Sequence, residues 1–325
     1  MDSNRNFLNR FSKHFERIDK ELNKNFSSRV PMIEDIGRHS LLGKGKRLRP
    51  LLFLLSGKLC GYKGEDIYSL STMFEYIHNA SLLHDDVIDN AATRRSKPSA
   101  KHIWGNSAAV LTGDYLSSKA AAIAVRTNNI ELLKMAIDTG ARMSEGQFLE
   151  LIHTGDWNTS KDEYMDIITS KTAELMSTTC ACGAIIAGAG KEISYNLSKY
   201  GLNLGIAFQL VDDLLDYASS EEELGKPVGK DLREGKITLP LIYTLSGSKN
   251  EEINRFENQF KGQDADEEDY MKLIKFVRKS GAIERIRSEA KEYSGKASEF
   301  LDIFPESPVK TDLIDLNEYV SKRNF

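Results

Sequence analysis

Two clusters of aspartates, each at the end of an apolar segment with helical periodicity, restrict this chain more than any other feature of its sequence. In the first, apolar side chains recur at helical spacing from Met73 to Leu83, and Asp85, Asp86 and Asp89 follow. Asp85 and Asp89 are four residues apart, so on a helix they share a face, about 5.4 Å from each other. Carboxylates beside an apolar face repel one another, and the dipole at a helix C-terminus disfavours them further. The sequence therefore predicts that positive charge compensates them.

The segment 205–217 repeats this arrangement, with Asp212, Asp213 and Asp216 at the same spacing on a second apolar helix. A single cluster would be explained equally well as helix-end acids on a solvated face, but a second copy favours a shared function. Oxygen ligands without His or Cys suit Mg²⁺, which proteins bind through one or two carboxylates together with substrate phosphates. The two clusters therefore predict a Mg²⁺–diphosphate site between two facing helices.

Length and composition favour a single helical domain. The 325 residues would fit about two domains on length alone, but no linker rich in Pro, Gly or Ser divides them. Long segments with helical periodicity, seven prolines and no clear run of alternating strand pattern predict an all-α chain. We therefore expect one domain over residues 1–325.

Charge and cysteine content narrow the function and the location. A formal net charge of −4 and a pI near 6.0 argue against nucleic-acid binding through bulk charge. The three cysteines, Cys60, Cys180 and Cys182, fit neither a disulfide framework nor a metal-binding pattern, and we expect them to be buried in a reducing compartment. The N-terminus lacks the apolar core of a signal peptide, and no apolar stretch reaches the ~18 residues of a membrane span. We expect a cytoplasmic protein without a transmembrane segment.

Further motifs make the pattern specific. In chain order they are Gly45-Lys46-Arg47-Leu48-Arg49-Pro50, Thr93-Arg94-Arg95, Gly113-Asp114-Tyr115-Leu116, Lys171-Thr172, Phe208-Gln209, and the stretch from Gly225-Lys226-Pro227 to Gly235-Lys236. With the two acid clusters they resemble the trans-prenyltransferases, or polyprenyl diphosphate synthases, from roughly Gly43 to the C-terminus. The resemblance implies a single-domain helical bundle around a deep apolar pocket, of the isoprenoid synthase type, and a homodimer. It also implies Mg²⁺ as cofactor, isopentenyl diphosphate and an allylic diphosphate as substrates, and peripheral membrane contact when the product is released.

The basic loop from Gly43 to Pro50 is the first candidate for diphosphate binding. It does not match a P-loop, because glycine rather than serine or threonine follows its first lysine. A solvated basic loop is one interpretation. The functional one is that Lys46 and Arg49 grip a diphosphate, the arginine through its bidentate fork. The resemblance assigns this pair, together with His78 and Arg95, to isopentenyl diphosphate.

Other residues are candidates for the allylic diphosphate. Lys171, in a helix rich in small residues, would need an anionic partner if buried, and a diphosphate oxygen would serve. Gln209 lies three residues before Asp212, on a neighbouring part of the same face. The basic, glycine-punctuated stretch after the second acid cluster is placed to fold over the metals like a lid. The allylic contacts that the resemblance implies are Arg94, Lys171, Thr172, Gln209, Lys226 and Lys236.

A gauge of product length is expected on the first acid-bearing helix. Ala80 and Ser81 precede Asp85 by five and four residues and so lie about one turn deeper along the helix. In the resembled family an aromatic residue there blocks the growing chain, whereas both side chains are small here. Ile77, below them, either closes the wall or leaves it open. The alternative is that the small residues only permit close helix packing. We expect a long, octaprenyl-like product.

Together these residues predict a trans-prenyltransferase that extends an allylic diphosphate by successive head-to-tail condensation with isopentenyl diphosphate. The expected metal ligands are Asp85, Asp89, Asp212 and Asp216. The expected catalytic residues are Asp85, Asp86, Asp89, Asp212, Asp213 and Lys171. The alternatives are a farnesyl or geranylgeranyl diphosphate synthase with a shorter product, a terpene cyclase, a head-to-head synthase, and a non-catalytic regulatory subunit of a heteromeric synthase.

Overall fold

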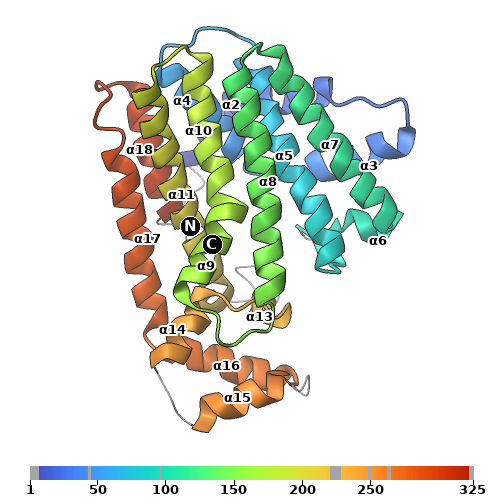
Figure 1. Cartoon of the computed structure of the whole chain (residues 1–325), viewed down its shortest axis with the longest axis vertical. Coiled ribbons are helices and arrows are strands. Elements are labelled where there is room, and N and C mark those ends of the chain that lie inside the picture. The colour runs from blue at the N-terminus through green and yellow to red at the C-terminus, as the bar shows by residue number, and fades with distance from the viewer. Residues whose placement is uncertain are drawn as a thin grey trace. The chain divides into compact units, whose positions relative to one another are not determined.

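The structure, a computed structural model, describes residues 7–42, 45–95, 97–219, 228–247, 251–261 and 265–321 (Figure 1). The chain divides into two compact units. The first comprises Met1–Ala141, Leu175–Gly201 and Phe300–Asp315, and the second comprises Arg142–Glu174, Leu202–Glu299 and Leu316–Phe325. The expectation that residues 1–325 form one domain stays a prediction.

The first unit is built almost entirely from helices. Its complete elements are α2 (Ser12–Asn25), α3 (Pro31–Leu41), α4 (Leu48–Leu59), α5 (Ile67–Ile88), β1 (Thr93–Arg94), β2 (Lys97–Pro98), α6 (Ala100–Trp104) and α7 (Asn106–Arg126). It also holds parts of α8 (Ile130–His153), α10 (Glu174–Ile186), α11 (Lys191–Ala218) and α18 (Pro308–Ser321). The two strands form a short antiparallel hairpin in which Arg94 pairs with Lys97.

Among its described residues, the second unit holds the remaining parts of those four helices and seven further helical elements. They are α9 (Lys161–Ile168), the π-helical turn η1 (Thr169–Ala173), α13 (Lys230–Arg233), α14 (Leu239–Gly247), α15 (Glu251–Lys261), α16 (Glu267–Lys279) and α17 (Ala282–Glu299). Its core packs large apolar residues from α11, α14, α16 and α17, among them Leu210, Tyr217, Leu239, Leu273 and Ile286. Full burial of one such side chain contributes about 1.5–3 kcal/mol to stability.

Helix α5 carries the first acid cluster at the end that the sequence predicts. It forms because its 22 residues contain neither glycine nor proline. It ends at Ile88, where the backbone N–H of Asp89 donates to the carbonyl of Asp85 at 2.8 Å. Asn90 then takes a left-handed φ of 51°, which turns the chain toward the hairpin. The acids therefore occupy the last helical turn and its cap.

Helices α5 and α7 pack side by side within the first unit (Figure 1). The imidazole of His84 on α5 lies over Gly113 of α7, where a Cβ atom would come within 2.4 Å of its Nε2. On the other side of α5, the run Leu51–Leu55 of α4 is fully buried. Helices α4 and α7 both pack against the acid-bearing helix.

The prediction of an all-α fold is confirmed. The only strands among the described residues are the two short ones of the hairpin. Among the described helices, none combines the length and the apolar character needed to cross a membrane.

Candidate functional site

The first acid cluster contains one deeply buried carboxylate and two at the surface of α5. Asp86 is only 2% exposed, and its Oδ1 lies 2.5 Å from Nε of Arg94 on the hairpin. Asp85 and Asp89 are half-buried. The predicted need for positive charge is therefore met at Asp86 by Arg94, since a buried carboxylate without a partner would be costly.

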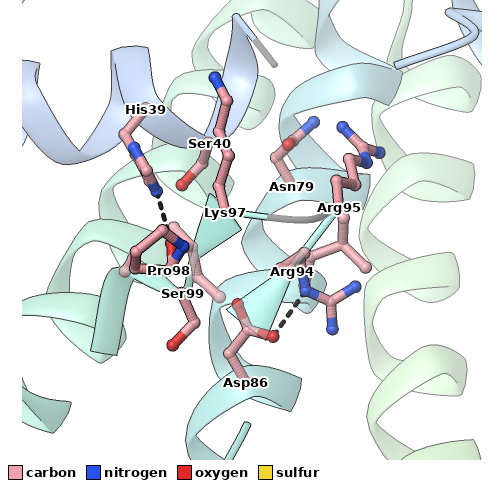
Figure 2. Close-up of a pocket in the computed structure, with 12 residues that line it drawn as sticks. His39, Ser40, Asn79, Asp86, Arg94, Arg95, Lys97, Pro98 and Ser99 are labelled. Carbon is pink, nitrogen blue, oxygen red and sulfur yellow. Dashed lines mark hydrogen bonds and ion pairs between the residues drawn. The ribbon is translucent and has the colours of Figure 1, made fainter. Parts of the chain in front are cut away.

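A cavity of about 290 Å³ lies beside this ion pair, entirely within the first unit (Figure 2). The end of α3, the C-terminal half of α5, the hairpin and the start of α6 line it. Its cationic side chains are Arg94, Arg95 and Lys97, and Asp86 is its one carboxylate. His39 of α3 fixes the hairpin through a 2.9 Å hydrogen bond between Nε2 and the carbonyl of Pro98. The excess of cations suits an anionic ligand.

The basic loop before α4 divides into a structural and a binding part. Arg47 is buried, and its Nε and Nη1 lie 2.7 Å from carboxylate oxygens of Asp19 and Glu75. It also donates to the carbonyl of Leu41. Arg47 therefore holds the fold together, which explains why a cation sits there in a left-handed conformation, at φ 48°.

Arg49 differs, because its buried Nε has no hydrogen-bond partner among the described residues. Burial lowers the pKa of Arg49 to about 10, and the nearby charge of Arg95 acts in the same direction. Burial likewise lowers the pKa of His78, and Arg49 and Arg95 lower it further. Lys46 is exposed on the same loop. Three of the four residues predicted for isopentenyl diphosphate, Arg49, His78 and Arg95, thus lie close enough for positive charges on them to repel one another. A bound anion would reduce this repulsion.

The second acid cluster, on α11, is built into a hydrogen-bond network. Asp213 is 4% exposed and accepts bonds from the hydroxyl of Tyr164 at 2.7 Å and from Nε2 of Gln209 at 2.6 Å. Burial raises the pKa of Asp213 to about 7, Asp212 and Asp216 act in the same direction, and the two hydrogen bonds oppose them. Asp216 is 1% exposed and accepts a 2.9 Å bond from the backbone N–H of Asp231. Asp212 is half-buried.

The predicted allylic contacts in the second unit line one cavity of about 160 Å³ with this cluster. They are Lys171, Thr172, Gln209 and Lys236, and the cluster contributes Asp212 and Asp213 to the same lining. The hydroxyl of Thr172 donates to Oε1 of Gln209 at 2.9 Å, which fixes the amide that donates to Asp213. Lys226 lies outside the described residues. Each unit is described by itself, so the expectation that the two acid clusters face each other stays a prediction.

Two residues in this cavity were missed by the sequence analysis. Glu150 forms a 2.6 Å ion pair with Lys171, the anionic partner that a half-buried lysine requires. Its sequence context gave little signal, because Glu150 is one of several charged residues on the same helical segment. Tyr164 donates to Asp213, and nothing in its sequence context distinguishes it from a core tyrosine.

The residues predicted to gauge product length lie on α5 as expected. Ala80 is buried, and Ser81 and Ile77 are half-buried. The hydroxyl of Ser81 donates to the carbonyl of His78 at 2.8 Å. Tyr76, one turn deeper, is fully buried, and its hydroxyl donates to the carbonyl of Leu22 in α2 at 3.3 Å. Tyr76 is therefore fixed in the core against α2.

The donor set fits a hard divalent cation that is completed by its ligand. The acids of both clusters offer only oxygen, and among the described residues no three His, Cys, Asp or Glu side chains already form a metal cage. Mg²⁺ is commonly bound in this way, through one or two carboxylates plus substrate phosphates. An all-helical chain with aspartate clusters beside lysines and arginines in this manner has the features of an enzyme that handles diphosphates.

Comparison with known proteins identifies the family. The Polyprenyl synthetase family matches residues 30–277, and the chain belongs to this family. The predicted enzyme class, a trans-prenyltransferase, is thereby confirmed. The octaprenyl diphosphate synthase of Haemophilus influenzae is 34% identical over 310 residues, which cover 95% of this chain and 94% of that protein.

Two further relatives show the range of the family. The geranylgeranyl diphosphate synthase of Saccharolobus solfataricus is 36% identical over 307 residues, covering 91% of this chain and 92% of that protein. The crystal structure of a polyprenyl synthase from Caulobacter crescentus, complexed with calcium and isoprenyl diphosphate, matches with a TM-score of 0.93 and 34% identity, covering 99% of this chain and 98% of that one. Relatives with products of different length are thus similarly close.

The ion pair between Asp86 and Arg94 is expected to behave as one energetic unit. In a double-mutant cycle of Asp86→Asn and Arg94→Gln, we expect a coupling free energy of about 1–2 kcal/mol in urea unfolding, because each single change leaves its partner unmatched in a partly buried place. A second cycle that combines Asp86→Asn with Lys97→Gln, in the same hairpin, is the control and should be additive within about 0.5 kcal/mol. Equal coupling in both cycles would contradict a specific pair.

Proposed function

We propose that this enzyme extends an allylic diphosphate by successive head-to-tail condensation with isopentenyl diphosphate and releases a long polyprenyl diphosphate. The observation that carries the proposal is the second-unit cavity, where Asp212 and Asp213 lie beside Lys171 and Lys236. Carboxylates suit a divalent cation and ammonium groups suit phosphate oxygens. A ligand that brings both, a metal-bound diphosphate, satisfies the two kinds of group at once.

In the proposed reaction, isopentenyl diphosphate binds in the first unit. Arg49 offers a buried N–H without a partner among the described residues, and its guanidinium can grip two phosphate oxygens. Arg95 and His78 share its electropositive neighbourhood. Lys46, exposed on the adjoining loop, adds a further charge.

The allylic diphosphate is the proposed ligand of the second set of cations. Lys171 and Lys236 would bind its phosphate oxygens, Thr172 and Gln209 would orient it, and Arg94 is assigned to the same substrate. The C–O bond of the allylic diphosphate breaks, the double bond of isopentenyl diphosphate attacks the resulting carbon, and a proton is lost. The released diphosphate is the proposed base. Lysine ammonium groups assist because they stabilise the charge that develops on the leaving group.

Mg²⁺ is the proposed cofactor, with Asp85, Asp89, Asp212 and Asp216 as ligands. Bound there, it would act as a Lewis acid toward the departing diphosphate. Asp86 and Asp213 are buried and would assist the metal ligands indirectly. Asp86 orients Arg94 through their ion pair, and Asp213 accepts hydrogen bonds from Tyr164 and Gln209. Burial is the main reason that the pKa of Asp213 is raised to about 7, and the charges of Asp212 and Asp216 add to it.

Removal of one carboxylate from either cluster should stop catalysis while leaving the fold intact. We expect Asp85→Ala and Asp212→Ala each to lower kcat about 10³-fold or more, because the developing charge of the leaving group loses its compensation. The measurement is turnover of geranyl diphosphate with labelled isopentenyl diphosphate, accompanied by circular dichroism.

The control is Asp138→Ala on an exposed position of α8, which should keep wild-type turnover. Chelation of divalent cations should abolish activity and Mg²⁺ should restore it. Turnover that survives chelation, or variants whose helical signal falls as much as their activity, would overturn the assignment.

A long product is proposed because the side chains one turn before Asp85 are small. Ala80 and Ser81 leave no bulky group there, and Tyr76 is held against α2 rather than left mobile. The similarity to an octaprenyl diphosphate synthase supports this proposal, and the similar identity to a geranylgeranyl diphosphate synthase is the reason to test it.

Chromatography of the dephosphorylated product of the purified chain is the test of product length. We expect wild-type products longer than geranylgeranyl, and Ser81→Phe should shift them to shorter chains, because an aromatic ring would occupy space beside α5. Ser81→Thr is the matched control and should keep the wild-type distribution. Wild-type synthesis that stops at farnesyl or geranylgeranyl would contradict the proposal, and inactivity of the chain alone would favour a regulatory subunit.

A homodimer is proposed from large apolar side chains that each unit leaves exposed. In the first unit, Leu111 of α7 is 63% exposed and Val125 of the same helix is also exposed. In the second, Phe148 of α8 is 67% exposed, and Ile152 lies one turn further on. Such side chains on a globular protein mark association surfaces.

Sedimentation equilibrium should give about twice the chain mass of 36.5 kDa. Leu111→Asp should shift the equilibrium toward the monomer, because a charge would be buried in the interface. Lys20→Asp, an exposed change on α2, is the control and should leave the dimer unchanged. A monomeric wild-type protein would contradict the proposal.

We propose that the enzyme is cytoplasmic and meets membranes only through its apolar product. The three cysteines are free, which fits a reducing compartment. Fractionation of cells that produce the full chain checks this location, and recovery in an oxidising compartment would contradict it.

A further inference from the structure

Glu150, near the end of α8, gathers three donors on a single carboxylate oxygen. Its Oε2 lies 2.6 Å from Nζ of Lys171, 3.2 Å from Nε2 of Gln147 and 3.8 Å from Nζ of Lys236. The side chain of Glu150 is mostly buried and lines the second-unit cavity. Both lysines are among the groups proposed to bind the allylic diphosphate. One carboxylate therefore links two cations that come from distant parts of the sequence.

The backbone brings Lys171 to Glu150 through an unusually close packing. A Cβ atom on Gly146 of α8 would lie 2.8 Å from the backbone nitrogen of Lys171 and 2.9 Å from Cβ of Ser170. Any residue other than glycine would thus push η1 away. The extra residue of the π-helical turn at Thr169–Ala173 presents Lys171 toward α8. Glu150, one turn beyond Gly146, then meets its ammonium group.

A second backbone contact brings Lys236 from the other side. The carbonyl of Gly235 accepts a 2.8 Å bond from the N–H of Gly155, just beyond the end of α8. Gly235 has a left-handed φ of 75°, which favours glycine at this turn. Lys236 follows directly, and its Nζ lies 3.0 Å from Glu234 as well as within reach of Glu150.

The two lysines would repel each other without the carboxylate of Glu150, so this arrangement differs from an isolated surface ion pair. Two lysines near one another repel, and each side chain has considerable rotamer freedom, so without an anion between them they would separate. Burial alone raises the pKa of Glu150, yet Lys171 and Lys236 outweigh it and hold the pKa below its ordinary value. Glu150 thus stays ionised. An ammonium group has three donors, so a bond from Lys171 to Glu150 is compatible with a bond from the same group to a second anion.

We propose that Glu150 is a positioning residue, which holds Lys171 and Lys236 at the spacing at which they receive the diphosphate of the allylic substrate. It does so without touching the substrate or the metal. This inference rests on the proposed function, because that function makes a diphosphate the ligand of the two lysines. Glu150 would thus affect substrate binding indirectly, through the two lysines that it holds in place.

The decisive variant is Glu150→Gln, which keeps the length of the side chain and removes its charge. A glutamine can still accept a bond from one lysine, but its NH₂ group repels the other. We expect the KM for geranyl diphosphate to rise about tenfold, which corresponds to about 1.4 kcal/mol and to the loss of one charge-assisted hydrogen bond. The KM for isopentenyl diphosphate should stay within about twofold.

Two further variants separate positioning from mere structural support. Glu150→Asp keeps the charge, and because lysine side chains are flexible the KM for geranyl diphosphate should recover to within about threefold of wild type. Glu145→Gln removes an exposed acid from the same helix and should change neither KM. The Mg²⁺ concentration for half-maximal activity, at saturating substrates, should be the same in Glu150→Gln as in wild type.

Several outcomes would overturn the inference. They are an unchanged KM in Glu150→Gln, a fall in KM, which would make the carboxylate a competitor of the substrate, and an equal rise for both substrates. A raised Mg²⁺ requirement would instead make Glu150 a metal ligand. If the wild-type chain transfers no prenyl group, the proposed function fails, but calorimetry with inorganic diphosphate and Mg²⁺ still tests Glu150: binding about tenfold weaker in Glu150→Gln supports the inference, and equal binding refutes it.

Discussion

Repulsion between neighbouring carboxylates is the constraint on which the rest of this structure depends. Each aspartate cluster includes at least one buried carboxylate, and like charges are screened less by water when they are buried. Contacts close to each buried acid offset this cost. Asp86 forms an ion pair with the guanidinium of Arg94. Asp213 accepts hydrogen bonds from a phenol and an amide, and Asp216 accepts one from a backbone N–H. The deepest acids are thus stabilised by the protein itself, and Asp85, Asp89 and Asp212 are half-buried, so that part of each side chain is open to solvent.

The buried arginines also differ in whether the protein supplies them with partners. Arg47 and Arg49 are two residues apart in one basic loop, yet Arg47 is bound to two acids and a carbonyl, whereas the buried Nε of Arg49 has no partner among the described residues. A buried donor left without a partner costs free energy that a bound anion recovers. A run of basic residues in a sequence does not distinguish an arginine that is paired within the fold, such as Arg47, from one such as Arg49, whose buried Nε has no hydrogen-bond partner among the described residues.

Much of the fold could be predicted from the sequence, because it follows from local pattern. Helical periodicity gave the all-α class and the end of α5 near Ile88, and ordered motifs gave the family. The pairing of Asp86 with Arg94 and the role of Glu150 could not be predicted in this way. Both depend on close approaches of backbone segments, such as that of η1 to Gly146, and periodicity carries no information about such distances. The roles of the individual site residues stay predictions.

Overall sequence identity does not predict the length of the product, which depends on a few local side chains. A geranylgeranyl synthase at 36% identity and an octaprenyl synthase at 34% are equally related to this chain, so identity cannot choose between them. The choice must lie with a few side chains that limit space. On α5, Ala80 and Ser81 are small, and the first bulky ring beyond them, Tyr76, is tied to the carbonyl of Leu22 and packed 6.2 Å from the ring of Phe26. Because that ring is already part of the core between α2 and α5, moving it would break a buried hydrogen bond as well as a packing contact. If a growing chain passes along α5, the side chains at Ala80, Ser81 and Ile77 rather than a mobile aromatic gate must set how far it goes.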